Sequence, residues 1–359
     1  MKILYAIQGT GNGHLSRARD IIPVLQKNHH IDILISGSQA DVELPFPVKY
    51  KFKGLGFVFG RKGGIDLVET YRKNRINVLL SEINSLPVHE YDLVINDFEP
   101  VSAWACYLSD TTCISISHQA AVMHKKSPKP KKSDIIGEAV LKNYAPVKAK
   151  YGFHFKAYSE NIYTPVIRAQ IREQSIENKG HYTVYLPAYD DERIVKVLDA
   201  CGDNRWEVFS KHNKIPVTTK NISIQPINNA AFIKSLASSA GVICGAGFET
   251  PAEALFMRKK LMVIPMKGQY EQQCNAAALE EMGIPILKSL KPKNIEKIIQ
   301  WTQTGAILQM DYPDNTDAII NQIISAHLGN EQNVPALIEK NYSVKKFRKL
   351  LLRKIISRY

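Results

Sequence analysis

The chain has 359 residues, more than one compact core usually holds. Hydrophobic residues make up 45% of it and charged residues 23%, which is ordinary for a globular protein. Its formal net charge of +13 favours polyanionic partners such as nucleic acid, anionic lipid or phosphorylated substrates, although a solvated charged surface gives the same sum. The sequence has no low-complexity tract, no internal repeat and no run of about 18 apolar residues, so we expect no transmembrane helix.

The N-terminus and the cysteines favour a cytoplasmic protein. Residues 3–7 are the only apolar run that follows Lys2 before glycines begin, which predicts a short buried strand rather than a secretory signal. The cysteines are odd in number and form no CxxC pair, so reduced thiols fit better than a disulfide framework or a zinc site. They are Cys106, Cys113, Cys201, Cys244 and Cys274.

The first half of the chain alternates short apolar runs with amphipathic stretches. Residues 3–7 predict a strand, which a glycine-rich loop and a helix follow. Further strands are predicted at residues 31–36, 91–96 and 112–117. Such alternation predicts a parallel sheet with helices on both faces. The apolar face of the first helix consists of Leu15, Ala18, Ile21, Ile22 and Leu25.

The same pattern restarts in the second half. Polar residues 158–179, which lack a clear periodicity, are interpreted as the linker. We therefore expect an α/β fold with two doubly wound, Rossmann-like domains (residues 1–164 and 165–328) that face across a cleft, and a basic helical tail (residues 329–359). The predicted elements are strands at 182–186, 206–209, 222–225 and 241–244, and helices at 252–257 and 272–282.

The first candidate site is the segment from Gly9 to His14, directly after the first strand. Its glycines allow a tight turn and a close approach of the backbone to an anion. The turn has three interpretations: a purely structural role, a dinucleotide site, or the placement of His14 to take a proton from a sugar hydroxyl. The glycine spacing is not GxGxxG, and Asp32 lies too close to be the usual ribose-binding acid, which disfavours a dinucleotide.

The second candidate site runs from Cys244 to Glu253. A strand is predicted to end at Cys244 and a helix to begin near Thr250, with glycines between them. Thr250 and Glu253 match a capping box, and Pro251 takes the first helical position, so Glu253 has a structural explanation. In the functional alternative, free backbone N–H groups bind a diphosphate and Glu253 accepts ribose hydroxyls.

A third candidate site follows Pro265 and extends from Gly268 to Asn275. The pattern predicts a loop that ends in a helix start. Neighbouring Glu and Gln side chains suit several sugar hydroxyls, but any helix with an acidic first turn has the same appearance.

Together, residues 241–283 resemble the donor-binding signature of inverting GT-B glycosyltransferases. The segment is similar to that of plant and animal UDP-glycosyltransferases, and to that of the peptidoglycan enzyme that transfers N-acetylglucosamine to a lipid-linked acceptor. The family pattern consists of a Gly, a Ser or Thr, a Glu, a Pro, an acidic residue with a Gln, and an Asn. At the family's spacing these fall on Gly247, Thr250, Glu253, Pro265, Glu271, Gln272 and Asn275.

The resemblance implies that residues 247–250 cradle the diphosphate, that Glu253 binds the ribose and that the adjacent Glu271 and Gln272 contact the donor sugar. Two departures weaken the inference to a particular donor. Gly245 stands where many members have a His that touches phosphate, and residues 186–190 replace a Gly-Ser-rich loop. The implied donor-binding residues are Gly245, Gly247, Phe248, Glu249, Thr250, Glu253, Glu271, Gln272 and Asn275.

The N-terminal loop also resembles this family. His14 matches the His of a Gly-His-Leu motif that is the catalytic base in the plant enzymes, where an Asp farther along the chain orients it. Asp97 is the candidate for that partner, and Glu99 and His118 are rivals. Arg168 resembles an Arg at the entry to the second domain, which meets a phosphate or pairs with a carboxylate. The acceptor or phosphate loop is Gly11, Asn12 and Gly13.

These features predict an inverting glycosyltransferase that moves a sugar from a nucleotide-diphosphate donor, a UDP-sugar, to an acceptor hydroxyl. The nucleotide sugar is a co-substrate, no further cofactor is expected, and the sequence has no Asp-x-Asp cluster for a divalent ion. Two alternatives remain open: a sugar-nucleotide epimerase of the same fold, and a non-catalytic polyanion-binding protein. Few aromatic residues interleave the basic ones, which disfavours nucleic acid as a partner.

Two basic segments suggest a peripheral membrane location. Residues 124–132 are rich in Lys and Pro, and residues 340–359 carry eight Lys or Arg and no acid. Apolar residues recur in the second segment at three- and four-residue spacing, as in helices that lie among lipid headgroups. We therefore predict attachment to an anionic membrane on its cytoplasmic face, which suits a lipid-linked acceptor. In the alternative, the apolar stripe packs on the N-terminal domain.

Overall fold

The computed structural model describes residues 1–37, 44–55, 76–132 and 134–327. The chain forms two compact units. Of the described residues, unit 1 contains those within 1–127, 134–166 and 314–327, and unit 2 contains those within 128–132 and 167–313. The predicted basic tail, residues 329–359, lies outside the described residues.

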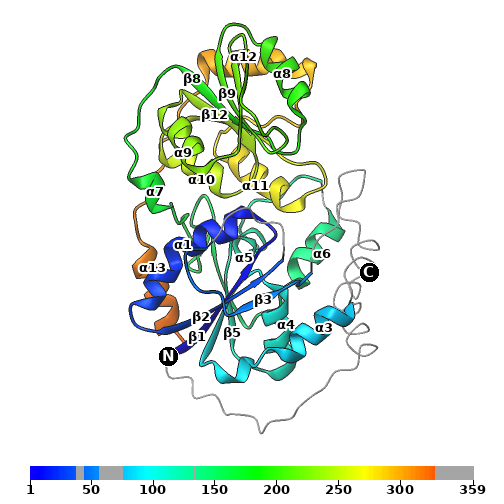
Figure 1. Cartoon of the computed structure of the whole chain (residues 1–359), viewed down its shortest axis with the longest axis vertical. Coiled ribbons are helices and arrows are strands. Elements are labelled where there is room, and N and C mark those ends of the chain that lie inside the picture. The colour runs from blue at the N-terminus through cyan, green and yellow to red at the C-terminus, as the bar shows by residue number, and fades with distance from the viewer. Residues whose placement is uncertain (38–43, 56–75, 133, 328–359) are drawn as a thin grey trace. The chain divides into compact units, whose positions relative to one another are not determined.

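Unit 1 is built on a seven-stranded sheet with the order β3-β2-β1-β4-β5-β6-β7 (Figure 1). Every neighbouring pair in this sheet runs parallel. Parallel strands need long crossovers, which explains the alternation of strand and helix along the chain. The strands are β1 (Lys2–Gln8), β2 (His30–Ser36), β3 (Tyr50–Phe52), β4 (Leu93–Asp97), β5 (Cys113–Ile116), β6 (Ala149–Phe153) and β7 (Ile162–Tyr163).

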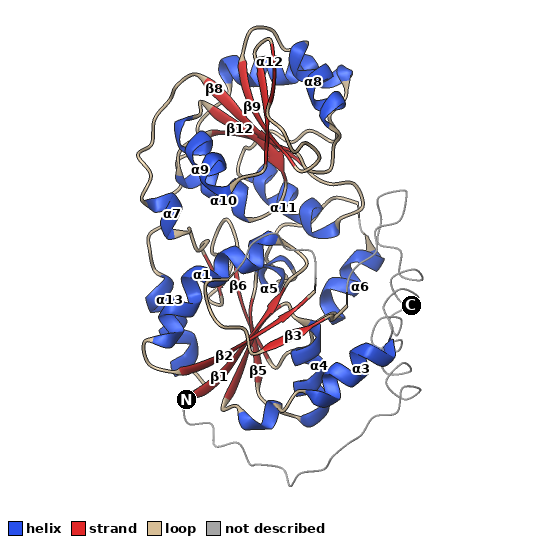
Figure 2. Ribbon diagram, viewed as in Figure 1, coloured by secondary structure: helices blue, strands red, loops and turns tan. Residues whose placement is uncertain are grey.

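Helices cover both faces of the sheet of unit 1 (Figure 2). All five residues of the predicted apolar face of α1 are buried, which confirms that assignment. The last described helix, α13, packs against α1, and Lys27 pairs with Asp317 at 2.7 Å. The helices are α1 (Asn12–Gln26), α3 (Ile76–Ser85), the 3-10 turn η1 (Val88–Glu90), α4 (Pro100–Ser109), α5 (His118–Val122), α6 (Ile135–Asn143) and α13 (Thr316–Ser325).

Unit 2 has a six-stranded sheet with the order β10-β11-β9-β8-β12-β13. The edge strand β10 is antiparallel to β11, and the other neighbouring pairs are parallel. One face of the sheet buries Tyr182, Trp206 and Trp301 in a common core cluster. The strands are β8 (His181–Tyr185), β9 (Arg205–Ser210), β10 (Val217–Thr219), β11 (Ile222–Pro226), β12 (Gly241–Gly245) and β13 (Lys260–Ile264).

The helices of unit 2 again lie on both faces of the sheet (Figure 2). They are α7 (Ala169–Arg172), α8 (Asp191–Asp199), α9 (Asn229–Ser238), α10 (Glu249–Phe256), α11 (Tyr270–Glu281), the 3-10 turn η2 (Pro292–Asn294) and α12 (Ile295–Thr304).

All of the strands predicted from the sequence are present, and their ends agree with the prediction to within two residues. The polar segment 158–179 contains the passage from unit 1 to unit 2 after Val166. It is not without structure, because the edge strand β7 and the short helix α7 lie within it. Edge strands are short and need no continuous apolar run, so the pattern of residues 158–179 did not reveal β7.

Candidate active site

His14 occupies the first turn of α1, close to the carboxyl end of β1. The helix begins at Asn12, and its N-cap residue, Gly11, is extended with φ −160° and ψ 148°. The His14 side chain is 13% exposed. The glycine-rich turn therefore brings a partly accessible imidazole to the edge of the sheet where ligands of doubly wound folds bind.

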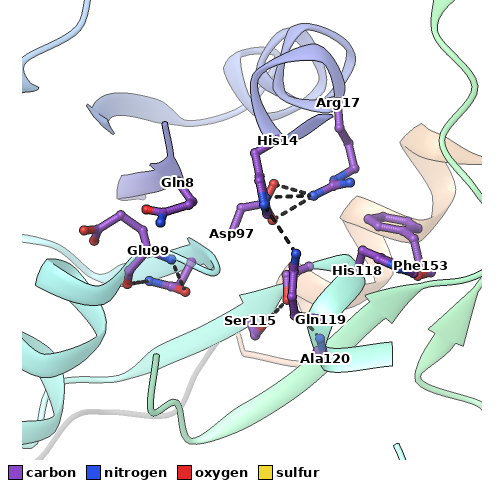
Figure 3. A network of polar contacts seen from close by, with 12 residues as sticks. Gln8, His14, Arg17, Asp97, Glu99, Ser115, His118, Gln119, Ala120 and Phe153 are labelled. Atoms are coloured by element: carbon purple, nitrogen blue, oxygen red, sulfur yellow. Dashed lines mark hydrogen bonds and ion pairs between the residues drawn. The ribbon is translucent and has the colours of Figure 1, made fainter. Parts of the chain in front are cut away.

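Asp97 is the last residue of β4, which lies beside β1 in the sheet. The register pairs Asp97 with Ile7 near the end of β1, so the two strands end together. His14 Nδ1 lies 2.9 Å from Asp97 Oδ1 (Figure 3). With the proton on Nδ1 directed at this carboxylate, Nε2 keeps a lone pair that can accept a proton.

Arg17, one helical turn after His14, completes the network. Its NH2 group donates to Asp97 Oδ1 at 2.8 Å and to Oδ2 at 2.7 Å, and lies 3.3 Å from His14 Nδ1. Burial by itself raises the pKa of Asp97, but the charges of Arg17 and His14 outweigh it and hold that pKa below its ordinary value. Asp97 is therefore a carboxylate at neutral pH, fully buried but paired.

Gln119 reaches the same imidazole from the other side. It lies in the first turn of α5, whose N-cap Ser117 accepts a hydrogen bond from Ala120 N. Gln119 Nε2 is 3.4 Å from His14 Nε2 (Figure 3). Neither Gln119 nor Arg17 was singled out from the sequence. The helical spacing from His14 could have indicated Arg17, whereas no local pattern connects Gln119 with a residue 105 positions away.

The two rivals of Asp97 have other roles. Glu99 is the N-cap of α4 and accepts hydrogen bonds from the backbone N–H groups of Val101 and Ser102 at 2.7 and 2.6 Å. Burial raises the pKa of Glu99 above its ordinary value. His118 Nδ1 donates to the carbonyl of Phe153 at 2.8 Å. Both side chains stabilise local structure through these bonds.

Asp32 is likewise explained by packing. It lies in β2 opposite Leu4 and accepts hydrogen bonds from Lys49 Nζ at 2.6 Å and from the Tyr91 hydroxyl at 2.7 Å. An acid that binds a dinucleotide ribose would lie at the carboxyl end of its strand. Asp32 lies nearer the other end, which agrees with the glycine spacing in disfavouring a dinucleotide.

The donor motif of unit 2 begins where β12 ends, at Gly245. The helix α10 starts at Glu249, with Phe248 as its N-cap residue and no side-chain cap hydrogen bond. The predicted capping box is therefore wrong, because the helix starts before Thr250 and the Glu253 side chain turns to another partner. Pro251 lies within the first turn of α10 rather than at its first position.

The glycines of this loop leave space beside the backbone. A Cβ atom built on Gly247 would meet no heavy atom within 4 Å, and one on Gly245 would meet only Gln272 Oε1 at 3.7 Å. In unit 1, by contrast, a Cβ on Gly9 would lie 2.8 Å from Ile35 Cγ2. Gly9 is therefore required by packing, whereas Gly247 leaves room next to the start of α10.

Glu253 lies in the second turn of α10 and faces Arg168. Arg168 Nε donates to Oε1 at 2.5 Å and NH2 donates to Oε2 at 2.9 Å. The two side chains are 12% and 3% exposed for Arg168 and Glu253 respectively. Of the two sequence-based alternatives for Arg168, a phosphate or a carboxylate, the structure contains the carboxylate pair.

The third motif ties α11 to the preceding loops. Gln272 Oε1 accepts a hydrogen bond from Met266 N at 2.8 Å, and Asn275 Nδ2 donates to the carbonyl of Ala246 at 3.1 Å. Asn275 is fully buried and so acts on the loop after β12 rather than at a surface. Glu271 is in the first turn of α11 and only partly buried.

The described residues contain no group of three or more His, Cys, Asp or Glu side chains that could hold a metal ion. No helix within the described ranges is long and apolar enough to cross a bilayer. All five cysteines are buried, and none of them forms a disulfide.

A family model described as Glycosyl transferase family 1 matches residues 1–302. Among solved structures, the chain is similar to a UDP-glucosyltransferase from Polygonum tinctorium, with 11% identity, 98% of each chain covered and a TM-score of 0.56. It is similar to UGT2 of Phytolacca americana, with 12% identity, 98% of each chain covered and a TM-score of 0.56.

MurG of Acinetobacter baumannii is also similar, with 14% identity, 90% of this chain and 99% of that chain covered, and a TM-score of 0.52. No curated protein sequence matches the chain. At these identities the structures show the fold, which is GT-B, as the sequence predicted.

Proposed function

The chain belongs to glycosyl transferase family 1, and from this membership we propose that it moves a sugar from a nucleotide-diphosphate donor, a UDP-sugar, to an acceptor hydroxyl with inversion at the anomeric carbon. Membership makes the protein a glycosyltransferase of the class that uses nucleotide sugars. It thereby selects the transferase over the epimerase and the non-catalytic polyanion-binding protein. The donor, the acceptor and the stereochemistry are the parts that we propose.

The observation that carries the proposal is the hydrogen bond between His14 Nδ1 and Asp97 Oδ1. With the Nδ1 proton directed at Asp97, the lone pair of the partly exposed imidazole is on Nε2. In the proposed reaction, Nε2 takes the proton of the acceptor hydroxyl while the oxygen attacks the anomeric carbon. The bond from that carbon to the β-phosphate oxygen breaks, and its electron pair leaves with the nucleoside diphosphate. Asp97 stabilises the imidazolium that forms.

Unit 2 supports donor binding through its backbone. The space beside Gly247 lies next to the start of α10, where backbone N–H groups carry the positive end of the helix dipole. We assign the diphosphate to this helix start, the ribose to Glu253 and the donor sugar to Glu271 and Gln272. In this assignment the helix start, rather than a metal ion, stabilises the charge on the leaving group.

A thermal-shift panel of nucleotides and nucleotide sugars tests the proposal. We expect uridine diphosphate and one or more UDP-sugars to raise the melting temperature, because a ligand that binds only the folded state stabilises it. Calorimetry on Glu253→Ala is expected to show binding of the same ligand weakened by about 1–3 kcal/mol, from loss of hydrogen bonds to a charged group. If no nucleoside diphosphate binds, the proposed donor is wrong. If Glu253→Ala binds normally, the ribose assignment is wrong.

We also propose that residues 340–359 attach the enzyme to an anionic membrane, where a lipid-linked acceptor would be found. Each of the eight basic residues contributes about 1 kcal/mol at most to the free energy of binding to such a surface. The attachment should therefore be reversible by salt. Co-sedimentation with vesicles of anionic and of zwitterionic phospholipid tests this. We expect the full-length chain to bind only the anionic vesicles at low salt. Binding that persists after deletion of residues 340–359 would refute the assignment.

A further inference from the structure

Arg168 occupies a defined place at the start of unit 2. The chain enters the unit at Ile167, and Arg168 is the N-cap residue of the short helix α7. Its fork holds both carboxylate oxygens of Glu253, so it links this entry segment to the second turn of α10. A bidentate arginine–carboxylate pair fixes the orientation of both groups, which a single hydrogen bond does not.

The remaining guanidinium nitrogen is also held. Arg168 NH1 donates to Asn229 Oδ1 at 2.8 Å, and Asn229 is the first residue of α9. Asn229 Nδ2 in turn donates to Gln170 Oε1 at 3.0 Å, on α7 itself. Each of the three guanidinium nitrogens therefore has a partner within unit 2. Together the three hydrogen bonds fix the plane of the guanidinium within unit 2.

The pairing has a consequence for the chemistry of Glu253. An ionised carboxylate is costly in a position only 3% exposed unless a counter-charge is bound to it. A carboxylate accepts about four hydrogen bonds, and the fork of Arg168 accounts for two of them. Arg168 thus keeps Glu253 charged and fixed in direction without converting it into a donor.

We propose that Arg168 is a positioning residue that holds Glu253 for the ribose of the nucleotide. Through Glu253 it sets the preference of the enzyme for ribonucleoside over 2′-deoxyribonucleoside diphosphates. The inference rests on the proposed function, in which Glu253 accepts the ribose hydroxyls. It extends the donor site to Arg168, a residue of the entry segment of unit 2 that lies outside the donor motif. It also assigns to Arg168 the control of selectivity for the ribose.

Calorimetry with UDP, 2′-deoxy-UDP and inorganic pyrophosphate tests the inference on the full-length protein. Wild type is expected to bind UDP about tenfold more tightly than 2′-deoxy-UDP, a ratio that corresponds to one good hydrogen bond. Glu253→Gln and Arg168→Gln should each reduce the ratio to near one, and Arg168→Lys, which keeps the charge but not the fork, should reduce it in part. Pyrophosphate, which lacks ribose, should bind all variants equally.

Arg172→Gln is the matched control. Arg172 lies on the same short helix, where its guanidinium packs over the ring of Phe256 and Nε donates to the carbonyl of Ile167 at 3.2 Å. Loss of either arginine loosens the attachment of α7, but only Arg168 holds Glu253 in its fork. The Arg172 variant should therefore keep the wild-type ratio. Thermal unfolding without ligand shows whether each variant folds. If Arg168→Gln does not fold, the nucleotide ratio of Arg168→Lys tests the inference.

Two results separate the inference from the function on which it rests. If Glu253→Gln loses the preference for ribose while both Arg168 variants keep it, Arg168 does not position Glu253 and the inference is overturned. If Glu253→Gln leaves the affinities for both nucleotides unchanged, the ribose assignment itself is wrong. A loss of pyrophosphate affinity in the Arg168 variants, with the ratio intact, would show a phosphate contact and would also overturn the inference. So would a wild-type ratio of one.

Discussion

The His14 region of unit 1 and the donor motif of unit 2 are both built at the carboxyl ends of parallel strands, but they use different groups. Around His14, side chains contact other side chains: Asp97 from β4, Arg17 from α1 and Gln119 from α5. In the donor motif, Glu253 likewise contacts a side chain, that of Arg168, but the side chains of α11 contact the backbone. Gln272 accepts from Met266 N, and Asn275 donates to the carbonyl of Ala246.

The difference reflects the role proposed for each region. A base must hold its lone pair in one direction, and a shell of charged and amide side chains fixes the ring and its tautomer. A diphosphate is bound by backbone N–H groups at a helix start, which require space beside the backbone and a loop of fixed shape. Removal of a side chain should therefore reduce turnover most in the His14 region of unit 1. Addition of an atom should reduce ligand binding most in the donor motif of unit 2.

The largest effect is expected for His14→Ala. Loss of the base should lower turnover of the donor found in the nucleotide panel by about 10²–10⁴-fold, while donor affinity stays at the wild-type value. Release of nucleoside diphosphate measures turnover, and calorimetry measures affinity. Glu99→Gln serves as the control, because it keeps one oxygen for the cap of α4 and should retain turnover. Normal turnover in His14→Ala would make His14 a structural residue.

The next largest effect is expected on stability. Arg17→Met leaves the fully buried Asp97 without its guanidinium partner, which should cost about 3–5 kcal/mol of unfolding free energy. Lys27→Met removes a pair in which both side chains are more than half exposed, and should cost less than about 1 kcal/mol. Urea denaturation compares the two variants. Equal losses of unfolding free energy in the two variants would show that burial does not make the Arg17–Asp97 pair more important for stability than an exposed pair.

A pair of glycine substitutions separates packing from ligand space. Gly9→Ala places a Cβ 2.8 Å from Ile35 Cγ2 and should destabilise the fold by about 1–3 kcal/mol. Gly247→Ala meets no atom within 4 Å, so its unfolding free energy should change by less than about 0.5 kcal/mol. Its affinity for nucleoside diphosphate should nevertheless fall about tenfold, because the methyl group fills space assigned to the diphosphate. Unchanged affinity in Gly247→Ala would show that the diphosphate does not bind at this loop.

No change is expected from removal of divalent metal. The leaving-group charge is assigned to backbone N–H groups at the start of α10, so turnover should survive incubation with EDTA. Turnover measured before and after EDTA, and again after excess magnesium, checks this. Complete loss that magnesium restores would contradict the assignment and would make the donor site of unit 2 a metal site.

Much of the architecture was predictable from the sequence. The buried strands of both sheets are apolar runs bounded by glycine or polar residues, so β1, β8 and β12 were located within one or two residues. The five-residue strands β6 and β13 were missed, and so were the edge strands β3, β7 and β10, which are two or three residues long. A strand that pairs on one side needs little apolar surface, so its sequence carries a weak signal.

The candidate site was predictable to a different extent in each unit. The spacing in residues 241–283 is a local pattern, so it indicated the donor motif without any knowledge of contacts. The capping box within it was wrong, because Thr250 and Glu253 have the right spacing but the helix begins earlier and Glu253 pairs with Arg168, 85 residues away. Local spacing does not determine which of two satisfactory partners a carboxylate takes.

The sequence by itself determined the alternation of strands and helices, the glycine-rich turn that carries His14, and the motif that resembles a donor site. Each of these depends on residues near one another in the chain. Only the tertiary structure brought Gln119 to the imidazole and Arg168 to Glu253, and only it assigned Glu99 and Asp32 to local structure. The pairing of a buried charge depends on which strands lie side by side and where each one ends, and this is set by the packing of the whole sheet.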